Sequence, residues 1–194
     1  MTGSGIYEMA CRSSLERNIV KLTETPLPGA FIIDLEPHRD ERGFFARTFC
    51  VREFAQHGLD SKVVQCNLSY NLKAGTLRGM HFQQPPVSEA KLVRCVRGAI
   101  HDVVVDLRPQ SATYQRHFAV ELSMENRRAL FVPALFAHGF QTLTDHTEVE
   151  YQMSEFYAPE AARGFRHDDP AFAIRWPLPI SVISPQDLVW PPFS

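Results

Sequence analysis

The stretch KLVRCVRGAIHDVVVDLRP, residues 91–109, contains two short runs rich in β-branched residues, separated by Arg97-Gly98. Runs of this kind are typical of β-strands, and a glycine between them is a common turn signal. We therefore predict that the two runs form a hairpin that turns at Arg97-Gly98.

Further strand candidates occur on both sides of this stretch, and Gly, Pro, Asn or Asp punctuate the joins between them. They are GAFIIDLEP (29–37), GFFARTF (43–49), KVVQCNLSY (62–70), GTLRGMHFQ (75–83), RHFAVELS (116–123), RALFVPALF (128–136), HGFQTL (138–143) and TEVEYQMSEF (147–156). The best helix candidate, VREFAQHG (51–58), is short. Regular short strands without alternating helices favour a sandwich or barrel over an α/β sheet.

The chain of 194 residues fits one compact domain. We predict an N-terminal extension over residues 1–25, loosely held because it has no clear period, and a single all-β domain over residues 26–194. Residues 156–172 predict a long irregular connection. The Pro-rich tail that follows carries Trp176, Trp190 and Phe193, and we expect it to dock on the domain or to contact another subunit.

Composition excludes several classes of partner. A formal net charge of -2 gives no broad basic field, which argues against nucleic acid. No apolar run approaches the roughly 18 residues that cross a bilayer, and the N-terminus lacks the apolar segment of a secretory signal. We therefore expect a cytoplasmic protein without membrane partners. The cysteines, Cys11, Cys50, Cys66 and Cys95, form no Cys-x-x-Cys pair, so we expect free thiols, with Cys95 filling core space.

The segment GTLRGMHFQ (75–83) carries a candidate catalytic histidine. In a regular strand His81 shares a face with Leu77 and Gly79, whereas Arg78 points to the other side. A bulge at Gly79 would let Arg78 and His81 reach the same cavity. A structural, hydrogen-bonded histidine is the alternative at this position.

Two further strands place polar groups among apolar ones. On TEVEYQMSEF, Tyr151 shares a face with Val149 and Met153, so we expect it to point inward, where its hydroxyl needs a partner. A core tyrosine tied to a backbone carbonyl is the alternative. Asp102 and Asp106 share a face with valine, which suits a polar barrel interior or an ion pair with Lys91 or Arg94.

The spacing of Pro133 and His138 in VPALFAHGF is similar to the second metal-binding motif of cupins. The first cupin motif requires a His-x-His pair, but Phe82 and Gln83 follow His81. Two histidines without a third ligand make a poor metal site, so we expect no metal.

Taken together, these segments resemble the dTDP-4-dehydrorhamnose 3,5-epimerase family. The matching stretches occur in the family order from about Leu27 to Pro192: DERGFF (40–45), Gln65-x-Asn67, LRGMHFQ (77–83), KLVRCVRG (91–98), DVVVDLRP (102–109), FAHGF (136–140), YQMSEFYAPE (151–160), DDPAFAIRWP (168–177) and SPQD (184–187). The resemblance implies a cupin-like jelly-roll β-barrel with a few short helices, a homodimer, no metal and no organic cofactor. It also implies a nucleotide-sugar substrate.

The resemblance assigns a role to each matching position. The catalytic base corresponds to His81, its partner carboxylate to Asp187, the proton-donating tyrosine to Tyr151, and a lysine near the keto oxygen to Lys91. Substrate-binding positions correspond to Arg42, Gln65, Asn67, Arg78, His138 and Tyr157, of which Tyr157 matches an aromatic that stacks on the nucleobase.

These residue types suit inversion beside a ketone. A neutral imidazole can remove the acidic proton next to a carbonyl, and a carboxylate fixes its tautomer and stabilises the imidazolium. A cation near the carbonyl oxygen stabilises the enolate. Reprotonation from the opposite face requires a second acid, for which Tyr151 is the candidate. The implied function is therefore an isomerase that inverts C3, C5 or both in a nucleoside-diphosphate 4-keto-6-deoxyhexose.

Some positions depart from the family pattern around the expected sugar and nucleotide, which leaves the exact substrate open. They are Arg47, Leu68, Leu135, Gln152, Ala162 and His167. Three alternatives therefore stand beside the epimerase: a 3,4-ketoisomerase of the same fold, a metal-dependent cupin oxygenase that uses His81 and His138, and a non-catalytic sugar-nucleotide-binding protein.

Overall fold

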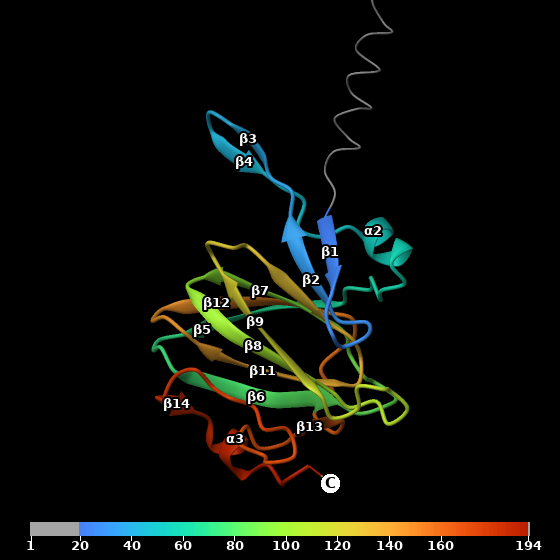
Figure 1. Ribbon diagram of the computed structural model, residues 1–194, viewed down its shortest axis with the longest axis vertical. Helices are drawn as coiled ribbons and strands as arrows, with labels where there is room; N and C mark the ends of the chain where they lie inside the picture. Colours follow the sequence, from blue (N-terminus) through green and yellow to red (C-terminus); the bar gives the residue numbers. More distant parts are fainter. Residues whose placement is uncertain (1–19, 194) are drawn as a thin grey trace, which may run out of the picture.

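The computed structural model describes residues 20–193, which form two facing β-sheets (Figure 1). The first sheet has the strand order β1-β2-β10-β7-β12-β5, and the second has the order β13-β6-β11-β8-β9, with β14 paired to β6. Their bounds are β1 Val20–Glu24, β2 Phe31–Leu35, β5 Gln65–Asn71, β6 Thr76–Gln83, β7 Lys91–Arg97, β8 Ala99–Asp106, β9 His117–Ser123, β10 Ala129–Val132, β11 Phe136–Thr142, β12 Thr147–Met153, β13 Ala162–Gly164 and β14 Val182–Ile183.

Four smaller elements complete the described chain. β3 (His38–Asp40) pairs with β4 (Gly43–Phe45), and the helices are α2 (Val51–Gln56) and α3 (Pro185–Val189). The predicted all-β architecture with a few short helices is confirmed, and the fold is a cupin-like jelly roll. None of the helices in residues 20–193 is long and apolar enough to cross a membrane.

The main core lies between the two sheets and is formed by alternate residues of facing strands. Val93 of β7 and Val149 of β12 pack from the first sheet against Val104 of β8 and Phe140 of β11 from the second. The same cluster contains Cys95, which is buried as predicted, and burial raises the pKa of its thiol to about 12. Because each strand turns one face to this core, the other face of the first sheet is available to loops, solvent or partners.

The predicted hairpin at Arg97-Gly98 is wrong, because β7 and β8 belong to different sheets. β7 pairs with β10 and β12, whereas β8 pairs with β11 and β9. At the junction, Gly98 has a φ of 76°. A Cβ there would lie 2.6 Å from Oγ1 of Thr147, so glycine allows the chain to cross between the sheets at this point. A local turn signal indicates a change of direction but does not say which strands pair.

The N-terminal part of the chain adds an edge strand. Residues 1–25 were expected to be a loosely held extension, but Val20–Glu24 forms β1 and pairs antiparallel with β2. The expectation is therefore wrong for residues 20–24. Residues 1–19, including Cys11, lie outside the described residues. The strand has few buried side chains, so its hydrophobic pattern gave a weak signal.

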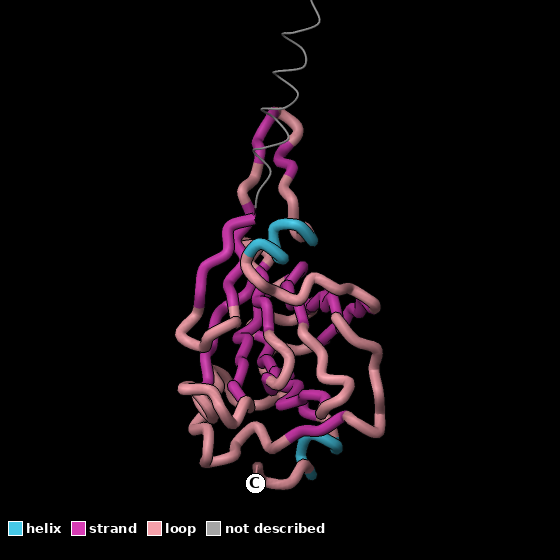
Figure 2. The backbone as a smooth tube through the Cα atoms, turned by 90° about the vertical axis from the view of Figure 1, so that its right-hand side faces the viewer, coloured by secondary structure: helices cyan, strands magenta, loops and turns pink. Residues whose placement is uncertain are grey.

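Two segments lie at opposite ends of the molecule. The β3–β4 hairpin projects beyond the barrel as an arm, and the C-terminal segment packs at the other end (Figures 1 and 2). Phe193 packs on Phe165 and Phe172, and the Trp176 indole N–H donates to the His167 carbonyl at 3.0 Å. The prediction that the tail docks is thus confirmed. The connection over residues 156–172 is irregular until β13 pairs with β6.

Candidate active site

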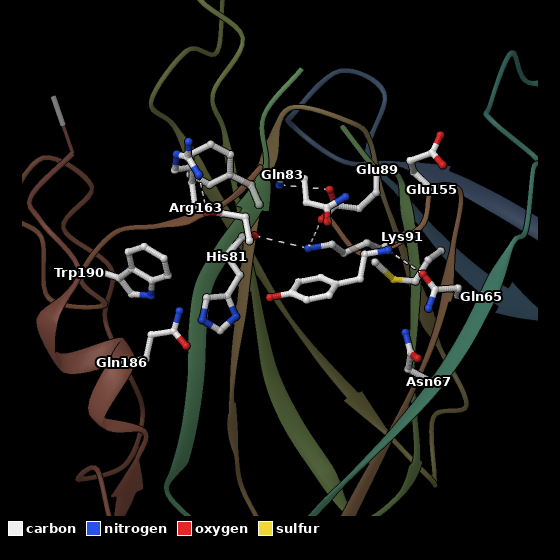
Figure 3. A pocket seen from close by; sticks show the side chains of 14 residues that line it. Gln65, Asn67, His81, Gln83, Glu89, Lys91, Glu155, Arg163, Gln186 and Trp190 are labelled. Carbon is white, nitrogen blue, oxygen red and sulfur yellow. Dashed lines mark hydrogen bonds and ion pairs between the residues drawn. The ribbon is translucent and has the colours of Figure 1, made fainter. Parts of the chain in front are cut away.

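A cavity opens between β5 and β12 of the first sheet and β6 of the second. Its outer part has a volume of about 450 Å³, and an inner part of about 290 Å³ lies toward Tyr151. Four residues line both parts and so join them into one cavity, namely Asn67, His81, Lys91 and Met153. In Figure 3, Trp190 and Gln186 lie on one side of His81, and Lys91, Gln65 and Asn67 lie on the other.

His81 and Asp187 form a hydrogen-bonded pair on the wall of this cavity. His81 Nε2 lies 2.5 Å from Asp187 Oδ1, and the exposed fractions of the two side chains are 45% and 3%. Burial acts to raise the pKa of Asp187, but hydrogen bonds from His81 and the Gly79 N–H outweigh it and hold that pKa below its usual value. The pair therefore combines an accessible imidazole with a buried carboxylate that is ionised at neutral pH.

The position of Asp187 follows from the start of α3. Ser184 caps this helix, and its Oγ accepts a hydrogen bond from the Asp187 backbone N–H at 3.1 Å. Pro185 at the first helical position suits the same arrangement, because its missing N–H would have no partner there. The SPQD segment thus places a carboxylate from the end of the chain beside a strand more than a hundred residues earlier.

A local irregularity brings Arg78 and His81 to one cavity, as predicted. The pairing of β6 with β11 shifts register between His138 and Phe140, opposite Gly79. Gly79 has a φ of 124°, and a Cβ at this position would lie 2.6 Å from the Gly139 Cα. Only glycine fits this close approach without strain. Arg78 Nε donates to Asn71 Oδ1 at 2.7 Å, which orients the guanidinium within the inner part of the cavity.

Lys91 places a buried positive charge next to His81. Its Nζ lies 2.9 Å from Glu89 Oε1 and 3.4 Å from the His81 carbonyl oxygen. Glu89 is itself fixed, because its Oε2 accepts the Gln83 backbone N–H at 3.1 Å. A buried charge needs such a partner. The pairing leaves Lys91 as a pre-positioned hydrogen-bond donor in the cavity.

Tyr151 lines the inner part of the cavity from the opposite sheet to His81. Its ring packs edge-on against His138, with centroids 6.2 Å apart. Burial raises the pKa of the phenol well above its usual value, although a hydrogen bond with Ser69 acts in the other direction. The hydroxyl therefore keeps its proton at neutral pH and can act as a proton donor.

A second histidine–carboxylate pair lies deeper in the barrel. His138 Nε2 is 2.7 Å from Asp102 Oδ1, and Asp102 Oδ2 has no hydrogen-bond partner among residues 20–193. The expected ion pair of Asp102 and Asp106 with Lys91 or Arg94 is therefore wrong. Asp102 instead lies in a polar part of the barrel interior, which was the other alternative for this strand.

Asp106 lies away from the cavity in a network of its own. It accepts hydrogen bonds from Arg108, Ser111 and Thr113. Burial opposes ionisation of Asp106, but these hydrogen bonds lower its pKa to about 2. Asp106 thus serves the fold at the end of β8 and takes no part in the candidate site.

The outer part of the cavity holds the residues expected to contact a nucleotide. Gln65 and Asn67 line it from β5, and Gln65 Oε1 accepts the Tyr157 backbone N–H at 2.7 Å. Tyr157 lines the cavity and is 68% exposed. Arg42 is not brought to this cavity. It lies on the β3–β4 arm, is 90% exposed and pairs with Asp40.

Several residues of the site were missed by sequence reasoning. Trp190, Arg163 and Gln186 line the outer cavity, Glu89 holds Lys91, and Asp102 holds His138. Asp102 gave a signal, because it stood among valines on a buried face. The other four lie on very short elements, as Arg163 does on β13 and Gln186 does on α3, or in the adjoining segments, where no period could assign them to a cavity.

Residues 20–193 contain no group of three or more His, Cys, Asp and Glu side chains placed to hold a metal ion. His81 and His138 each direct Nε2 to a carboxylate instead. The oxygenase alternative therefore has no ligand set in the described part of the chain.

Comparison with known proteins gives a consistent result. The family profile described as dTDP-4-dehydrorhamnose 3,5-epimerase matches residues 24–194. The chain is 45% identical over 175 residues to the enzyme of that name from Methanothermobacter thermautotrophicus, covering 89% of this chain and 94% of the relative.

Two solved structures are similar over most of the chain. The dTDP-4-dehydrorhamnose 3,5-epimerase of Bacillus anthracis, with TDP and PPi bound, is 38% identical with a TM-score of 0.87, covering 90% of this chain and 100% of that one. A 3'-monoepimerase from Streptomyces bikiniensis in complex with dTDP-quinovose is 34% identical with a TM-score of 0.79, covering 87% and 85%.

Proposed function

The chain belongs to the dTDP-4-dehydrorhamnose 3,5-epimerase family and is an epimerase, and we propose that it uses His81 and Tyr151 to invert carbon centres of a dTDP-linked 4-keto-6-deoxyhexose. The observation that carries this mechanism is the His81–Asp187 pair facing Tyr151 across one cavity. His81 comes from β6 and Tyr151 from β12, so the two groups approach a bound sugar from opposing sheets.

In the first step, His81 removes the proton from the carbon next to the C4 ketone. The C–H bonding electrons form a C=C bond, and the carbonyl π electrons move to O4 to give an enolate. The bond to Asp187 supports this step, because the carboxylate stabilises the imidazolium as it forms. His81 is the more accessible member of the pair, which suits a group that must touch substrate.

Lys91 stabilises the enolate in this proposal. Its ammonium group lies beside the His81 backbone and is ion-paired to Glu89, so its position does not have to be organised during the reaction. A preorganised charge at the oxygen where negative charge develops lowers the barrier more than a mobile one. Glu89 partly neutralises the charge of Lys91 and fixes the direction of the lysine side chain.

In the second step, Tyr151 delivers its proton to the opposite face of the same carbon, and the ketone re-forms. The phenol starts protonated because burial raises its pKa. The phenolate formed is then reprotonated, and the imidazolium gives up its proton, so no net proton is consumed. His138 lies edge-on to the Tyr151 ring, and both His138 and Arg78 line the inner part of the cavity. These two residues are proposed to bind the sugar and phosphate groups.

Gln65, Asn67 and Tyr157 are proposed to bind the nucleotide at the outer part of the cavity. Two relatives carry TDP or a dTDP-sugar in their structures, which supports thymidine diphosphate as the nucleotide part of the substrate, which stays attached to the sugar throughout the reaction. Tyr157 lines the cavity and is exposed, so a nucleobase can stack on its ring.

A homodimer is proposed because Arg42 has no route to the cavity of its own chain. The β3–β4 arm that carries it extends beyond the barrel (Figure 2). Phe44 and Phe45 on that arm are exposed. A second copy of the chain would cover these rings and receive Arg42. Sedimentation analysis at micromolar concentration should therefore give a dimer, and a monomer with full activity would contradict this part of the proposal.

Deuterium exchange tests the proposed chemistry. The protein is incubated in heavy water with a dTDP-4-keto-6-deoxyhexose, and NMR follows the C3 and C5 signals. We expect wild type to introduce deuterium at C3, C5 or both, and His81→Ala to lose exchange by about 10³-fold or more. The position labelled distinguishes a 3,5-epimerase from a 3'-monoepimerase.

His117→Ala is the matched control, because His117 is an exposed histidine on β9 that lines neither part of the cavity. It should exchange at the wild-type rate. Absence of exchange in wild type, or undiminished exchange by His81→Ala, would refute the assignment. Appearance of a 3-keto product would instead favour the ketoisomerase reaction.

A further inference from the structure

Trp190 stands beside the proposed base at the wall of the cavity. It follows α3 directly, lines the outer cavity and lies next to His81 in Figure 3. The centroids of the indole and imidazole rings are 6.5 Å apart, and the ring planes are inclined by 65°. The two rings thus meet edge to face.

The indole also binds the carboxylate that supports His81. Trp190 Nε1 donates to Asp187 Oδ1 at 3.3 Å, and this is the oxygen that lies 2.5 Å from His81 Nε2. The other oxygen, Oδ2, accepts the Gly79 backbone N–H at 3.4 Å. Two side-chain donors therefore share one oxygen of Asp187.

The position of the indole is fixed from two further directions. A Cβ on Gly164 would lie 2.6 Å from both Cε2 and Nε1 of Trp190, so the ring packs directly against the glycine, where no side chain would fit. Gly164 is the cross-strand partner of His81 in the pairing of β13 with β6. Arg166 Nη1 donates to the Leu188 carbonyl at 2.8 Å and ties down the end of α3. The indole is held in place even without substrate.

We propose that Trp190 is a positioning residue of the His81–Asp187 pair, which shares the carboxylate oxygen with the imidazole and holds the imidazole edge at the cavity wall. This inference rests on the proposed function, because it takes His81 as the base. Its physical content is that the indole N–H draws negative charge of Asp187 away from the imidazole. The imidazolium form of His81 is then less stabilised than it would be without the indole. The imidazole therefore remains neutral, and able to accept a proton, down to a lower pH.

Other titratable groups face the pair, and all of them are retained in a variant at position 190. Those that face His81 or Asp187 from the surrounding elements are Lys91 with Glu89, Arg78, Arg163, His138 with Asp102, Tyr151 and His167. Their contribution is common to wild type and variant. The difference between the two proteins therefore reports on the indole.

Trp190→Phe keeps an aromatic ring at the wall but removes the N–H. Asp187 Oδ1 then directs all of its charge to His81, which stabilises the imidazolium. The acid limb of the plot of kcat/KM against pH, measured by heavy-water exchange, should move to higher pH by about half a unit. At pH values on this limb, kcat/KM should then be about threefold lower than in wild type. The plateau at high pH should change little, because the neutral imidazole retains its carboxylate.

Trp176→Phe is the matched control. It removes an indole hydrogen bond of similar length, to the His167 carbonyl, outside the cavity. Its acid limb should coincide with that of wild type. Trp190→Leu is a second variant without the N–H, so that a fold defect peculiar to one substitution does not decide the result.

An NMR titration of the His81 imidazole in the substrate-free protein provides a readout that does not need turnover. The titration should move to higher pH in Trp190→Phe and Trp190→Leu. An equal loss of activity at every pH, with an unchanged NMR titration, would mean that Trp190 only shapes the cavity, and it would overturn the inference. An unchanged plot of kcat/KM against pH would overturn it as well. If wild type shows no exchange that depends on His81, it is the proposed function that fails.

Discussion

Replacing Asp187 by Asn tests the central pair, because it keeps the shape of the side chain and removes its charge. The carboxylate lies 2.5 Å from His81 Nε2, which puts the centres of charge about 4 Å apart once the imidazole is protonated. At an effective dielectric constant of about 20, this attraction is about 4 kcal/mol. His81 is 45% exposed, so solvent screening reduces it to about 2 kcal/mol.

A further contribution of about 1 kcal/mol follows from the hydrogen bond itself, because an amide can present its N–H₂ to the imidazole and favour the wrong tautomer. The total of about 2–3 kcal/mol corresponds to a fall in kcat of about 30-fold to 150-fold. KM should change little, because Asp187 is buried behind His81 and does not line either part of the cavity. The acid limb should move to lower pH, opposite to the shift expected for Trp190→Phe.

The assay is the initial rate of deuterium incorporation at C3 and C5 as a function of pH and substrate concentration. Asp34→Asn is the control, since it removes a carboxylate that pairs with Arg128 on the surface, away from the cavity. A kcat for Asp187→Asn within threefold of wild type would refute the reasoning. So would an unchanged kcat with a raised KM, because Asp187 would then serve binding.

Three further predictions follow from the same structure. Tyr151→Phe should still exchange the substrate proton with solvent but should lose inverted product by about 10²-fold, as chiral analysis of the sugar would measure. Asp106→Asn should lower the free energy of unfolding by about 2 kcal/mol at pH 7. Because the folded-state pKa of Asp106 is depressed to about 2, that difference should disappear as pH falls from about 4 toward 2 in urea titrations. A thiol reagent should label exposed Cys66 in the native protein, and buried Cys95 only after unfolding, as peptide mapping by mass spectrometry would detect.

Sequence reasoning succeeded where the evidence was local. The alternation on residues 147–156 placed Tyr151 on the inward face, and Gly79 between Arg78 and His81 indicated the irregularity that brings both side chains to one cavity. Both inferences need only the period of a strand and the conformational freedom of glycine.

The same reasoning failed where the answer depended on partners distant in the chain. The two runs on either side of Gly98 are strands, but their pairing is decided by which strands of a sheet bury complementary faces. Asp102 stood out as a polar residue on a buried face, yet its partner His138 lies on a strand 36 residues away. Trp190 was expected only to dock with the tail, since its place beside His81 depends on the position of α3.

The two histidine–carboxylate pairs support the proposal that His81, and not His138, is the base. His81 and His138 are cross-strand partners on β6 and β11, and each binds an aspartate through Nε2. They differ in access, because the His81 side chain is 45% exposed and that of His138 is 5% exposed. A base must reach a C–H bond and exchange its proton afterwards, which only the accessible ring can do readily. His138, enclosed beside Tyr151, is better placed to orient the phenol and the sugar than to carry a proton to solvent. The same pair chemistry thus supports two roles, and access to the cavity separates them.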